Sequence, residues 1–463
     1  MRYISTRGQA PVLDFEAAML TGLARDGGLY VPAEVPAMAP AGIAALAGLS
    51  YEDAAFRVMW PFVDGCFGEA EFRAIIARAY AAFPHPARCP LVQIGPNDWI
   101  LELHHGPTLA FKDVAMQLIG QMFQTVLGRR GERVTIVGAT SGDTGSAAIE
   151  AFRGLDAVDV VILYPHGRVS EVQRRQMTTP TEANVHALAV EGTFDDCQAL
   201  VKAMFNDFAF RDEVGLAAVN SINWARVLAQ VVYYVTAAVS LGAPARGVSF
   251  SVPTGNFGDI FAGHIARRMG LPVETLVIAT NENDILHRAL QTGVYESRGV
   301  VATIAPSMDI QVSSNFERLL FELYGADGGA VTAAMTELAS TGRFALPQGA
   351  AAGLRAGFAS ARVDRDEAMA TIARVHRETG IVLDPHTAIG VAAGGHARGR
   401  AAVPMVTLGT AHAAKFPDAV ERACGVRPAL PARMADLYDR PERMSVVAND
   451  LAAVEAVVRE RRR

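Results

Sequence analysis

Short apolar runs alternate with longer segments of helical spacing through most of the chain. The alternation is clearest between about residues 91 and 408, where several of the apolar runs have no polar face. Strands of this kind are typical of a parallel sheet that helices cover on both sides. The pattern therefore predicts an α/β fold. The clearest predicted strands are residues 133–137 (RVTIV), 158–163 (VDVVIL), 248–252 (VSFSV), 273–279 (VETLVIA) and 403–408 (VPMVTL).

The first part of the chain is rich in alanine and follows a different pattern. Residues 51–60 and 69–82 have helical spacing, and residues 26–32 (DGGLYVP) combine a Gly-Gly turn with a short strand. A proline-rich stretch, residues 83–90 (FPHPARCP), then interrupts regular structure. We therefore predict an N-terminal domain over residues 1–85.

Two further segments, residues 227–241 and 459–463, have compositions that predict their environment. Residues 227–241 form the most apolar long stretch, but Gln230 and Thr236 interrupt it. The stretch is also shorter than the roughly 20 residues that a membrane helix needs, so we predict a buried helix. The arginine-rich end, residues 459–463 (RERRR), is predicted to be solvated and frayed.

Composition and charge narrow the class of protein. Of the 463 residues, 51% are hydrophobic and 19% are charged, which is typical of a globular chain. The net charge of −6 provides no general attraction for nucleic acid or for an anionic membrane. We therefore expect no nucleic-acid or membrane partner, and an anionic ligand needs a local site.

The cysteines and the N-terminus indicate the compartment. The four cysteines lie far apart and form no C-x-x-C pair, so neither a zinc site nor a disulfide framework is predicted. The N-terminal sequence MRYISTRGQAPVLDF lacks the continuous apolar segment of a secretory signal. We expect no metal ion and a cytoplasmic location.

The loop after the first predicted strand, residues 138–152 (GATSGDTGSAAIEAF), is rich in small residues. Small residues let backbone N–H groups approach an anion, and the N-terminus of the following helix adds a positive potential. The glycine spacing differs from that of dinucleotide-binding and P-loop motifs. An ordinary tight connection is the alternative.

The loop PTGNFGD (residues 253–259) also follows a predicted strand. Its turn precedes a helix that is predicted to run from Asp259 to about Met269. Accessible glycines at the N-terminus of a helix suit a terminal phosphate, although they also occur at purely structural joints.

A lysine lies in the first turn of the helix that the segment HHGPTLAFKDVAMQLIG (residues 104–120) predicts. The positive end of the helix dipole disfavours a cation at Lys112. Such a conflict indicates either a lysine with a lowered pKa that acts as a nucleophile or base, or an exposed lysine on the helix surface.

Eight motifs, taken together, resemble those of a known family. They are DGGLYVP (26–32), HHGPTLAFKD (104–113), GATSGDTGSAA (138–148), NSINWAR (220–226), PTGNFGD (253–259), SMDIQVSSNFERL (307–319), DPHTAIG (384–390) and TAHAAKF (410–416). In type and order they resemble the threonine synthase family, whose members use pyridoxal phosphate (PLP), and they span nearly the whole chain. The N-terminal extension and the SSNFER segment resemble the bacterial and fungal branch of this family.

The resemblance implies a fold type II PLP enzyme, similar to the β chain of tryptophan synthase. Such an enzyme has two open parallel-sheet lobes and an N-terminal α-rich cap. The resemblance further implies a catalytic domain of two lobes over residues 86–395. A C-terminal segment, residues 396–463, is expected to return to the active site and to end in helices.

The resemblance also assigns the residues that bind the cofactor. Lys112 is expected to hold PLP as a Schiff base, and Thr410 to face the pyridine nitrogen. Asp143 is expected near the phenolic oxygen of the ring, where many fold type II relatives carry Asn, and its role stays open. The backbone N–H groups expected to cup the cofactor phosphate are those of Gly255, Asn256, Phe257 and Gly258.

The implied reaction converts O-phospho-L-homoserine and water into L-threonine and phosphate. It is a γ-elimination followed by β-addition of water, the last step of threonine biosynthesis, with Lys112 or the released phosphate as the base in the hydration step. The residues expected at the substrate carboxylate are Ser141, Gly142 and Thr144. Those expected at the substrate phosphate are Asn220, Ser221 and Arg226.

Several alternatives accompany this interpretation. A PLP-dependent threonine or serine dehydratase would share the fold and the lysine, and a threonine-synthase-like binding protein would keep the fold without turnover. Five histidines are acid or base candidates, although a packed structural role is the alternative for each: His104, His105, His264, His386 and His412. The protein is expected to be a monomer or a homodimer.

Overall fold

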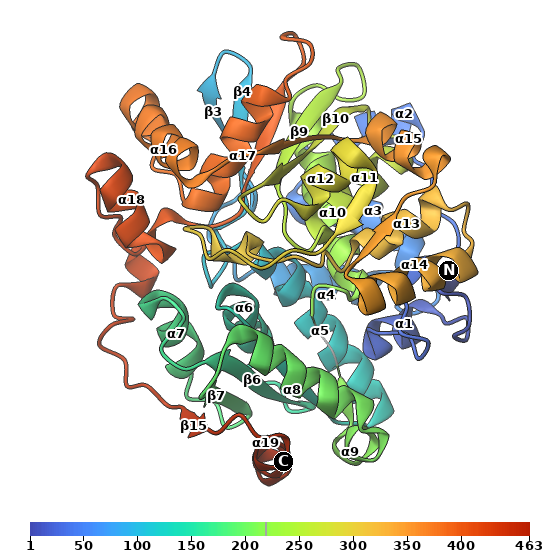
Figure 1. The fold of residues 1–463 in the computed structure, drawn as a ribbon, viewed down its shortest axis with the longest axis vertical. Helices are drawn as coiled ribbons and strands as arrows, with labels where there is room; N and C mark the ends of the chain where they lie inside the picture. The colour runs from blue at the N-terminus through green and yellow to red at the C-terminus, as the bar shows by residue number, and fades with distance from the viewer. Residues whose placement is uncertain (218–219) are drawn as a thin grey trace.

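Two sheets form the two lobes of the molecule (Figure 1). The computed structural model describes residues 1–217 and 220–463. The larger sheet has the strand order β13 (Ala359–Arg362), β10 (Val273–Thr280), β9 (Val248–Pro253), β14 (Met405–Gly409), β4 (Asp98–Glu102), β3 (Leu91–Gly95). The smaller sheet has the order β15 (Ser445–Val447), β7 (Val185–Val190), β6 (Val158–Pro165), β5 (Val134–Ala139), β8 (Leu216–Ala217).

Every pairing in the two sheets is parallel except that of β3 with β4. The predicted α/β fold is therefore confirmed. All five strands predicted from the apolar runs are present, with ends shifted by one or two residues. The start of β14 shifts by two residues because the strand begins after Pro404, a residue with no N–H to donate to a sheet.

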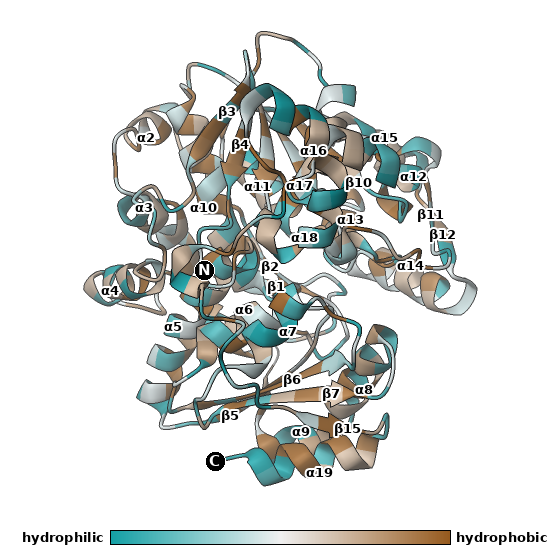
Figure 2. Ribbon diagram, turned by 90° about the vertical axis from the view of Figure 1, so that its left-hand side faces the viewer, coloured by the Kyte–Doolittle hydropathy of each residue, from teal (hydrophilic) through white to brown (hydrophobic). Residues whose placement is uncertain are grey.

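Helices cover both faces of the smaller sheet. Helix α7 (Glu171–Thr178) flanks it, and Figure 1 shows this lobe mostly in green below the larger one. Figure 2 shows the apolar strands β5 to β7 in brown, as buried strands require. One face packs against α5 (Lys112–Arg130) and α6 (Asp143–Phe152). The other packs against α8 (Phe194–Asn206), α9 (Phe208–Val214) and α19 (Leu451–Arg461).

The larger sheet is also covered on both faces. Helices α10 (Trp224–Ser240) and α11 (Gly258–Arg268) cover one face, and α17 (Pro385–His396) covers the other. Helices α16 (Arg365–Thr379) and α18 (Pro417–Cys424) lie outside α17. The apolar stretch predicted as a buried helix is the buried body of α10. Within the described ranges, no helix is long and apolar enough to span a membrane.

The N-terminal residues form a layer of helices around a short antiparallel sheet that packs against the start of α10. The rings of Tyr3 and Phe62 both lie about 6.1 Å from that of Trp224. The elements of this layer are β1 (Tyr3–Ser5), α1 (Phe15–Thr21), β2 (Tyr30–Pro32), α2 (Pro40–Ala44), α3 (Tyr51–Val63) and α4 (Glu69–Tyr80).

Smaller elements join these parts. A second antiparallel ribbon pairs β11 (Val294–Glu296) with β12 (Arg343–Ala345). The remaining helices are α12 (Ile285–Thr292), α13 (Phe316–Leu323), α14 (Gly328–Thr341) and α15 (Gln348–Gly357). Three short 3₁₀ turns are η1 (Pro306–Met308), η2 (Ala413–Lys415) and η3 (Ala432–Met434).

The C-terminal segment passes from one lobe to the other. In Figure 1 it runs from α18 in the larger lobe down to β15 and α19 in the smaller one. At its end, Arg463 Nε lies 2.7 Å from Oδ1 of the buried Asp159, and Arg459 pairs with Glu213. The prediction that this end is solvated is confirmed, since residues 459–463 are all exposed. The prediction that it is frayed is wrong, because these ion pairs anchor it to the smaller lobe.

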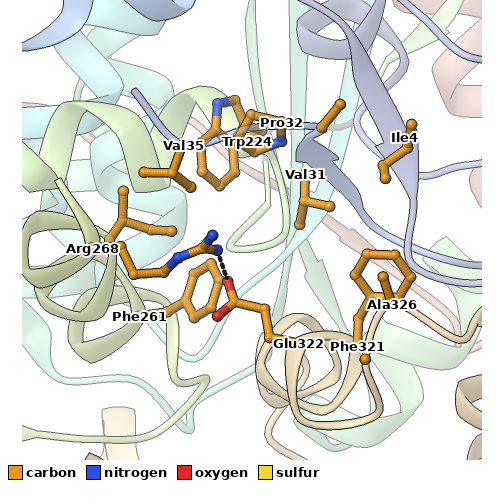
Figure 3. A pocket seen from close by; sticks show the side chains of 13 residues that line it. Ile4, Val31, Pro32, Val35, Trp224, Phe261, Arg268, Phe321, Glu322 and Ala326 are labelled. Carbon is orange, nitrogen blue, oxygen red and sulfur yellow. Dashed lines mark hydrogen bonds and ion pairs between the residues drawn. The ribbon is translucent and has the colours of Figure 1, made fainter. Parts of the chain in front are cut away.

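A cavity of about 430 Å³ separates the N-terminal layer from α11 and α13 (Figure 3). Most of its lining side chains are apolar, and the ion pair between Arg268 and Glu322 lies at one side. No residue predicted for the active site lines this cavity.

Candidate active site

The predicted site residues lie where chain segments of the two lobes meet. The segment after β5 leads into α6 of the smaller lobe, and the segment after β9 leads into α11 of the larger lobe. Open parallel sheets bind ligands at such carboxyl ends of strands. One cavity of about 60 Å³ brings together predicted residues from four segments: Lys112, Thr144, Ser221, Arg226 and Gly255 to Gly258.

Lys112 is the first residue of α5 and is only 8% exposed. Its Nζ lies 3.4 Å from Asp143 Oδ2 and 4.8 Å from the centroid of the Phe111 ring. Burial lowers the pKa of Lys112, while the carboxylate of Asp143 acts in the opposite direction. The alternative of an exposed surface lysine is therefore wrong, and the side chain has the environment of a reactive amine.

The turn before α5 holds Lys112 in this place. Asp113 accepts hydrogen bonds from Thr108 N (2.8 Å) and Thr108 Oγ1 (2.6 Å), which fold the HGPT turn over the helix start. A Cβ on Gly106 would collide with Asp113, so only glycine fits there. On the other side, Phe111 N donates to Thr410 O at 2.8 Å. The motif around Lys112 therefore fixes the helix start on both sides.

The loop from Gly255 to Gly258 forms a narrow cup at the start of α11. Phe257 has a φ of 64°, and α11 begins at the next residue, so backbone N–H groups lie at the helix N-terminus. A Cβ on Gly255 would lie 2.7 Å from Ser307 O. Asn315 Nδ2 donates to Asn256 O and to Ser221 O, both at 3.0 Å. This one amide ties three of the recognised motifs together.

Arg226 projects a buried cation into the same cavity. Its side chain lies on α10, is 4% exposed, and its Nη1 has no hydrogen-bond partner among the described residues. Burial lowers the pKa of Arg226 to about 10. A buried guanidinium with an unpartnered N–H is stabilised by an anion, and guanidinium and phosphate form paired hydrogen bonds. The cavity is therefore suited to a phosphate group.

Asp143 is the most extensively bonded side chain near the site. Its Oδ1 accepts from Lys415 Nζ (2.7 Å) and Gln173 Nε2 (2.8 Å). Its Oδ2 accepts from Ser307 Oγ (3.2 Å) and Lys112 Nζ (3.4 Å). Burial alone would raise the pKa of Asp143, but the two lysines and the hydrogen bonds hold it well below its ordinary value. The carboxylate is therefore ionised.

The other predicted residues occupy different places. Thr410 is buried and contacts the segment before Lys112 through its carbonyl. Ser141 and Gly142 form the turn before α6, where Gly142 has a φ of 138° and a Cβ would collide with Gln173. Asn220 is exposed and does not line the cavity, and its Oδ1 accepts from Ile222 N at 3.4 Å.

Two of the candidate histidines lie close to the site in structural roles. His386 Nε2 accepts from Ser307 N at 3.2 Å, and its Nδ1 lies 2.8 Å from Asp384 Oδ1. His412 Nδ1 accepts from Ala414 N at 3.1 Å, and burial lowers the pKa of His412. Neither lines the 60 Å³ cavity. His386 supports the Ser307 segment, which in turn contacts Asp143.

The sequence analysis missed four residues around the site: Gln173, Ser307, Asn315 and Lys415. Three of them stand inside recognised motifs, and Lys415 is the only lysine or arginine in the AHAAKF segment, where His412 is the only other polar side chain. That isolated charge was an available signal. Gln173 lies on α7, outside every motif, and only the tertiary structure brings it to Asp143.

The residues present fit PLP, a phosphorylated aldehyde. The buried amine of Lys112 can bind an aldehyde, and the cup at α11 can take a phosphate. Among the residues that the structure describes, no three His, Cys, Asp or Glu side chains are grouped as metal ligands would be.

Comparison with known proteins gives three family matches along the chain. "Threonine synthase N terminus" matches residues 2–80, "Pyridoxal-phosphate dependent enzyme" matches residues 87–362, and "Threonine synthase, C-terminal" matches residues 387–458. Threonine synthase from Pseudomonas aeruginosa is 56% identical over 459 residues, covering 99% of this chain and 98% of that protein. Threonine synthase-like 2 from Homo sapiens is 37% identical and covers 96% of this chain and 94% of that protein.

A solved structure is similar over the full length. The crystal structure of PLP-bound threonine synthase from Brucella melitensis aligns with a TM-score of 0.97 and 57% identity, covering 100% of each chain. The similarity includes both lobes and the N-terminal layer.

Proposed function

Because the chain belongs to the threonine synthase family of PLP-dependent lyases, we propose that it converts O-phospho-L-homoserine and water into L-threonine and phosphate. The reaction is a γ-elimination followed by β-addition of water. One observation supports this substrate most strongly: Arg226, whose Nη1 has no hydrogen-bond partner in the described part of the chain, shares a cavity of about 60 Å³ with Lys112. Arg226 can bind the phosphate of the substrate. Lys112 is the amine that would hold the cofactor and that the amino group of the substrate would replace.

Each site residue then has a proposed task. The backbone N–H groups of residues 255–258 bind the cofactor phosphate, and Thr410 faces the pyridine nitrogen. Bound PLP supplies an electron sink for negative charge at the substrate carbon atoms. A neutral hydroxyl does not enforce protonation of that nitrogen, which suits elimination better than transamination.

Lys112 binds the cofactor and, once released by the substrate amine, moves protons at Cα and Cβ. Burial lowers its pKa, so the amine can be unprotonated when it acts as the base.

Two groups of residues are proposed to hold the two ends of the substrate. Those at the phosphate are Asn220, Ser221 and Arg226; those at the carboxylate are Ser141, Gly142 and Thr144.

Other features of the molecule stay proposals. We propose a division into an N-terminal domain (1–85), a catalytic domain (86–395) and a C-terminal segment (396–463), with the first boundary between α4 and β3. A cytoplasmic location and a monomeric or homodimeric state stay predictions.

The product assay tests the proposal. Purified protein loaded with PLP is incubated with O-phospho-L-homoserine, and threonine and phosphate are measured together. We expect equal amounts of both, and no threonine from Lys112→Ala. In ¹⁸O-labelled water the label is expected in the threonine hydroxyl. Dominant formation of 2-oxobutanoate from threonine would instead identify a dehydratase, and absence of any turnover would identify a binding protein.

A further inference from the structure

A second buried lysine lies beside the site without lining its cavity. Lys415, at the end of η2, is 0% exposed. Its Nζ donates to Asp143 Oδ1 at 2.7 Å and to Thr108 O at 2.8 Å. These bonds hold the ammonium group against the start of α6 and the turn before α5. Lys415 is therefore placed to act on Asp143 and not on a ligand in the cavity.

The composition of the chain makes this lysine unusual. Only three of the 42 Lys and Arg residues are lysines, namely Lys112, Lys202 and Lys415. Lys202 is exposed on α8, whereas the other two contact the same carboxylate. A compact ammonium fits a small buried space and has three donors on one atom, whereas the five donors of a guanidinium lie in one wide plane that needs more room. The chain uses arginine at almost every other cationic position, so a buried lysine at position 415 departs from its general composition.

The geometry shows which lysine neutralises Asp143. The carboxylate lies 2.7 Å from Lys415 Nζ but 3.4 Å from Lys112 Nζ. Gln173 and Ser307 orient the carboxylate, but neutral donors do not cancel its charge. Without Lys415, the ionised Asp143 would have Lys112 as its one lysine partner and would stabilise a proton on that amine.

The remaining charges near Lys112 do not replace this pairing. Arg226 on α10 adds positive potential from the substrate side, and the buried Asp259 on α11 faces Lys112 from the larger lobe. Asp259 Oδ1 accepts hydrogen bonds from Tyr233 (2.5 Å) and Tyr234 (3.0 Å). Lys415 is thus the ammonium closest to Asp143 and makes the Asp143–Lys415 pair neutral.

We propose that Lys415 is a positioning residue of the reaction: by neutralising Asp143, it lets this carboxylate orient Lys112 without retaining a proton on it. The inference rests on the proposed role of Lys112 as the reacting amine. It explains how a carboxylate can stand beside a lysine that must lose its proton. Lys415 acts through Asp143 and contacts neither substrate nor cofactor.

The rate of PLP binding to the apoprotein tests this role at the amine itself. Only unprotonated Lys112 reacts with the aldehyde, so the pH midpoint of this rate, followed by visible absorption, measures the proton affinity of Lys112. We expect the midpoint to rise by about one unit or more in Lys415→Met and to fall in Asp143→Asn, because the two changes remove opposite charges. Lys202→Met is the matched control and is expected to keep the wild-type midpoint.

The double variant Asp143→Asn with Lys415→Met restores a neutral pair. We expect its midpoint to return to within about half a unit of wild type, and its kcat for threonine formation to exceed that of Lys415→Met by about tenfold or more. A purely structural role would not produce opposite shifts in the single variants. If Lys415→Met does not fold, the other two variants still give the comparison.

Midpoints that do not move, that move in the same direction, or that are not restored in the double variant would overturn the inference. These outcomes are separate from failure of the proposed function. Wild-type protein that forms threonine while the midpoints stay fixed refutes only the role of Lys415. Wild-type protein that binds PLP but forms no threonine refutes the proposed function, and the midpoints still test Lys415.

Discussion

At the scale of single residues, the site is organised by buried charges, which interact more strongly than charges in water. Lys112, Lys415 and Arg226 are all buried, and Asp143 pairs with the two lysines. Arg226 alone among these three cations keeps a buried N–H without a partner in the described part of the chain. The three cations thus have two kinds of environment. Lys112 and Lys415 pair with Asp143, whereas Arg226 is free to bind an anion through its Nη1.

Arg226→Gln is expected to weaken substrate binding. Hydrogen bonds to a charged group contribute about 1.5–3 kcal/mol, so the KM for O-phospho-L-homoserine should rise about 10- to 150-fold. The visible absorption of bound PLP should stay unchanged, and Arg226→Lys should recover part of the affinity because it keeps the charge. Steady-state kinetics measure this. Loss of PLP binding with an unchanged KM would instead assign Arg226 to the cofactor phosphate.

Asp259→Asn is expected to change how stability depends on pH. Burial raises the pKa of Asp259 from 3.8 to about 6 in the folded protein. Because the pKa of Asp259 is higher in the folded than in the unfolded state, binding of its proton stabilises the fold. This contribution is complete below the unfolded pKa of 3.8 and is lost as the pH rises from there to about 6. The variant lacks this loss, so its advantage over wild type should grow by about 1.4 kcal/mol from pH 5 to pH 8, which corresponds to about one pKa unit.

Urea unfolding of the two apoproteins at several pH values measures this difference. The amide oxygen of Asn can still accept from Tyr233 and Tyr234, and its nitrogen replaces Oδ2 of Asp259, which has no hydrogen-bond partner among the described residues. An advantage that is constant with pH, or that shrinks as the pH rises, would refute the titration of Asp259.

Single residues were predictable where a motif carries the chemistry. Lys112 was identifiable because a cation at a helix N-terminus conflicts with the dipole. Lys415 left only the weak signal of a single lysine in its motif, because its importance depends on the distance to Asp143, which joins positions far apart in sequence. Asn220 stands in a recognised motif but is exposed outside the cavity, so its proposed contact with the substrate phosphate rests on the motif alone.

At the scale of elements, loops and helix ends carry the site, and buried polar side chains join them. Arg318 on α13 donates to Tyr30 O at 3.0 Å and to Ile222 O, which links the N-terminal layer to the segment before α10. The sequence predicted the strands and helices from their apolar periodicity. It could not predict such joints, because they depend on backbone carbonyls that have no sequence signature.

Gly255→Ala is expected to damage the phosphate cup more than Gly258→Ala. A Cβ at residue 255 would lie 2.7 Å from a backbone oxygen, whereas one at residue 258 would lie 3.3 Å from the side chain of Asn315. Overpacking of this kind costs about 1–3 kcal/mol, so the Kd for PLP should rise about 5- to 150-fold in Gly255→Ala. Equilibrium titration of both apoproteins measures this. Equal effects of the two substitutions would show that the cup is not tightest at residue 255.

At the scale of the whole molecule, the site joins the two lobes. Asp143 begins α6 on the smaller sheet, Gly258 begins α11 on the larger one, and the C-terminal segment brings Lys415 between them. The resemblance to the threonine synthase family implied this two-lobed arrangement. It did not predict the anchored C-terminus, because a run of arginines usually marks a solvated end.

PLP is therefore expected to stabilise the whole molecule. A ligand that binds only the folded state contributes about 2.7 kcal/mol at a concentration of 100 times its Kd. Removal of PLP should lower the Tm, and addition of PLP should restore it in proportion to the logarithm of its concentration. Differential scanning calorimetry measures both. A Tm that is the same with and without PLP would contradict a site built between the lobes.

Borohydride reduction followed by peptide mapping tests the central claim most directly. Reduction fixes PLP permanently to the lysine that holds it, and the chain offers only Lys112, Lys202 and Lys415. The structure predicts that the PLP mass appears on the peptide containing Lys112 alone. Fixation of PLP at Lys415 or Lys202, with Lys112 unmodified, would contradict the account.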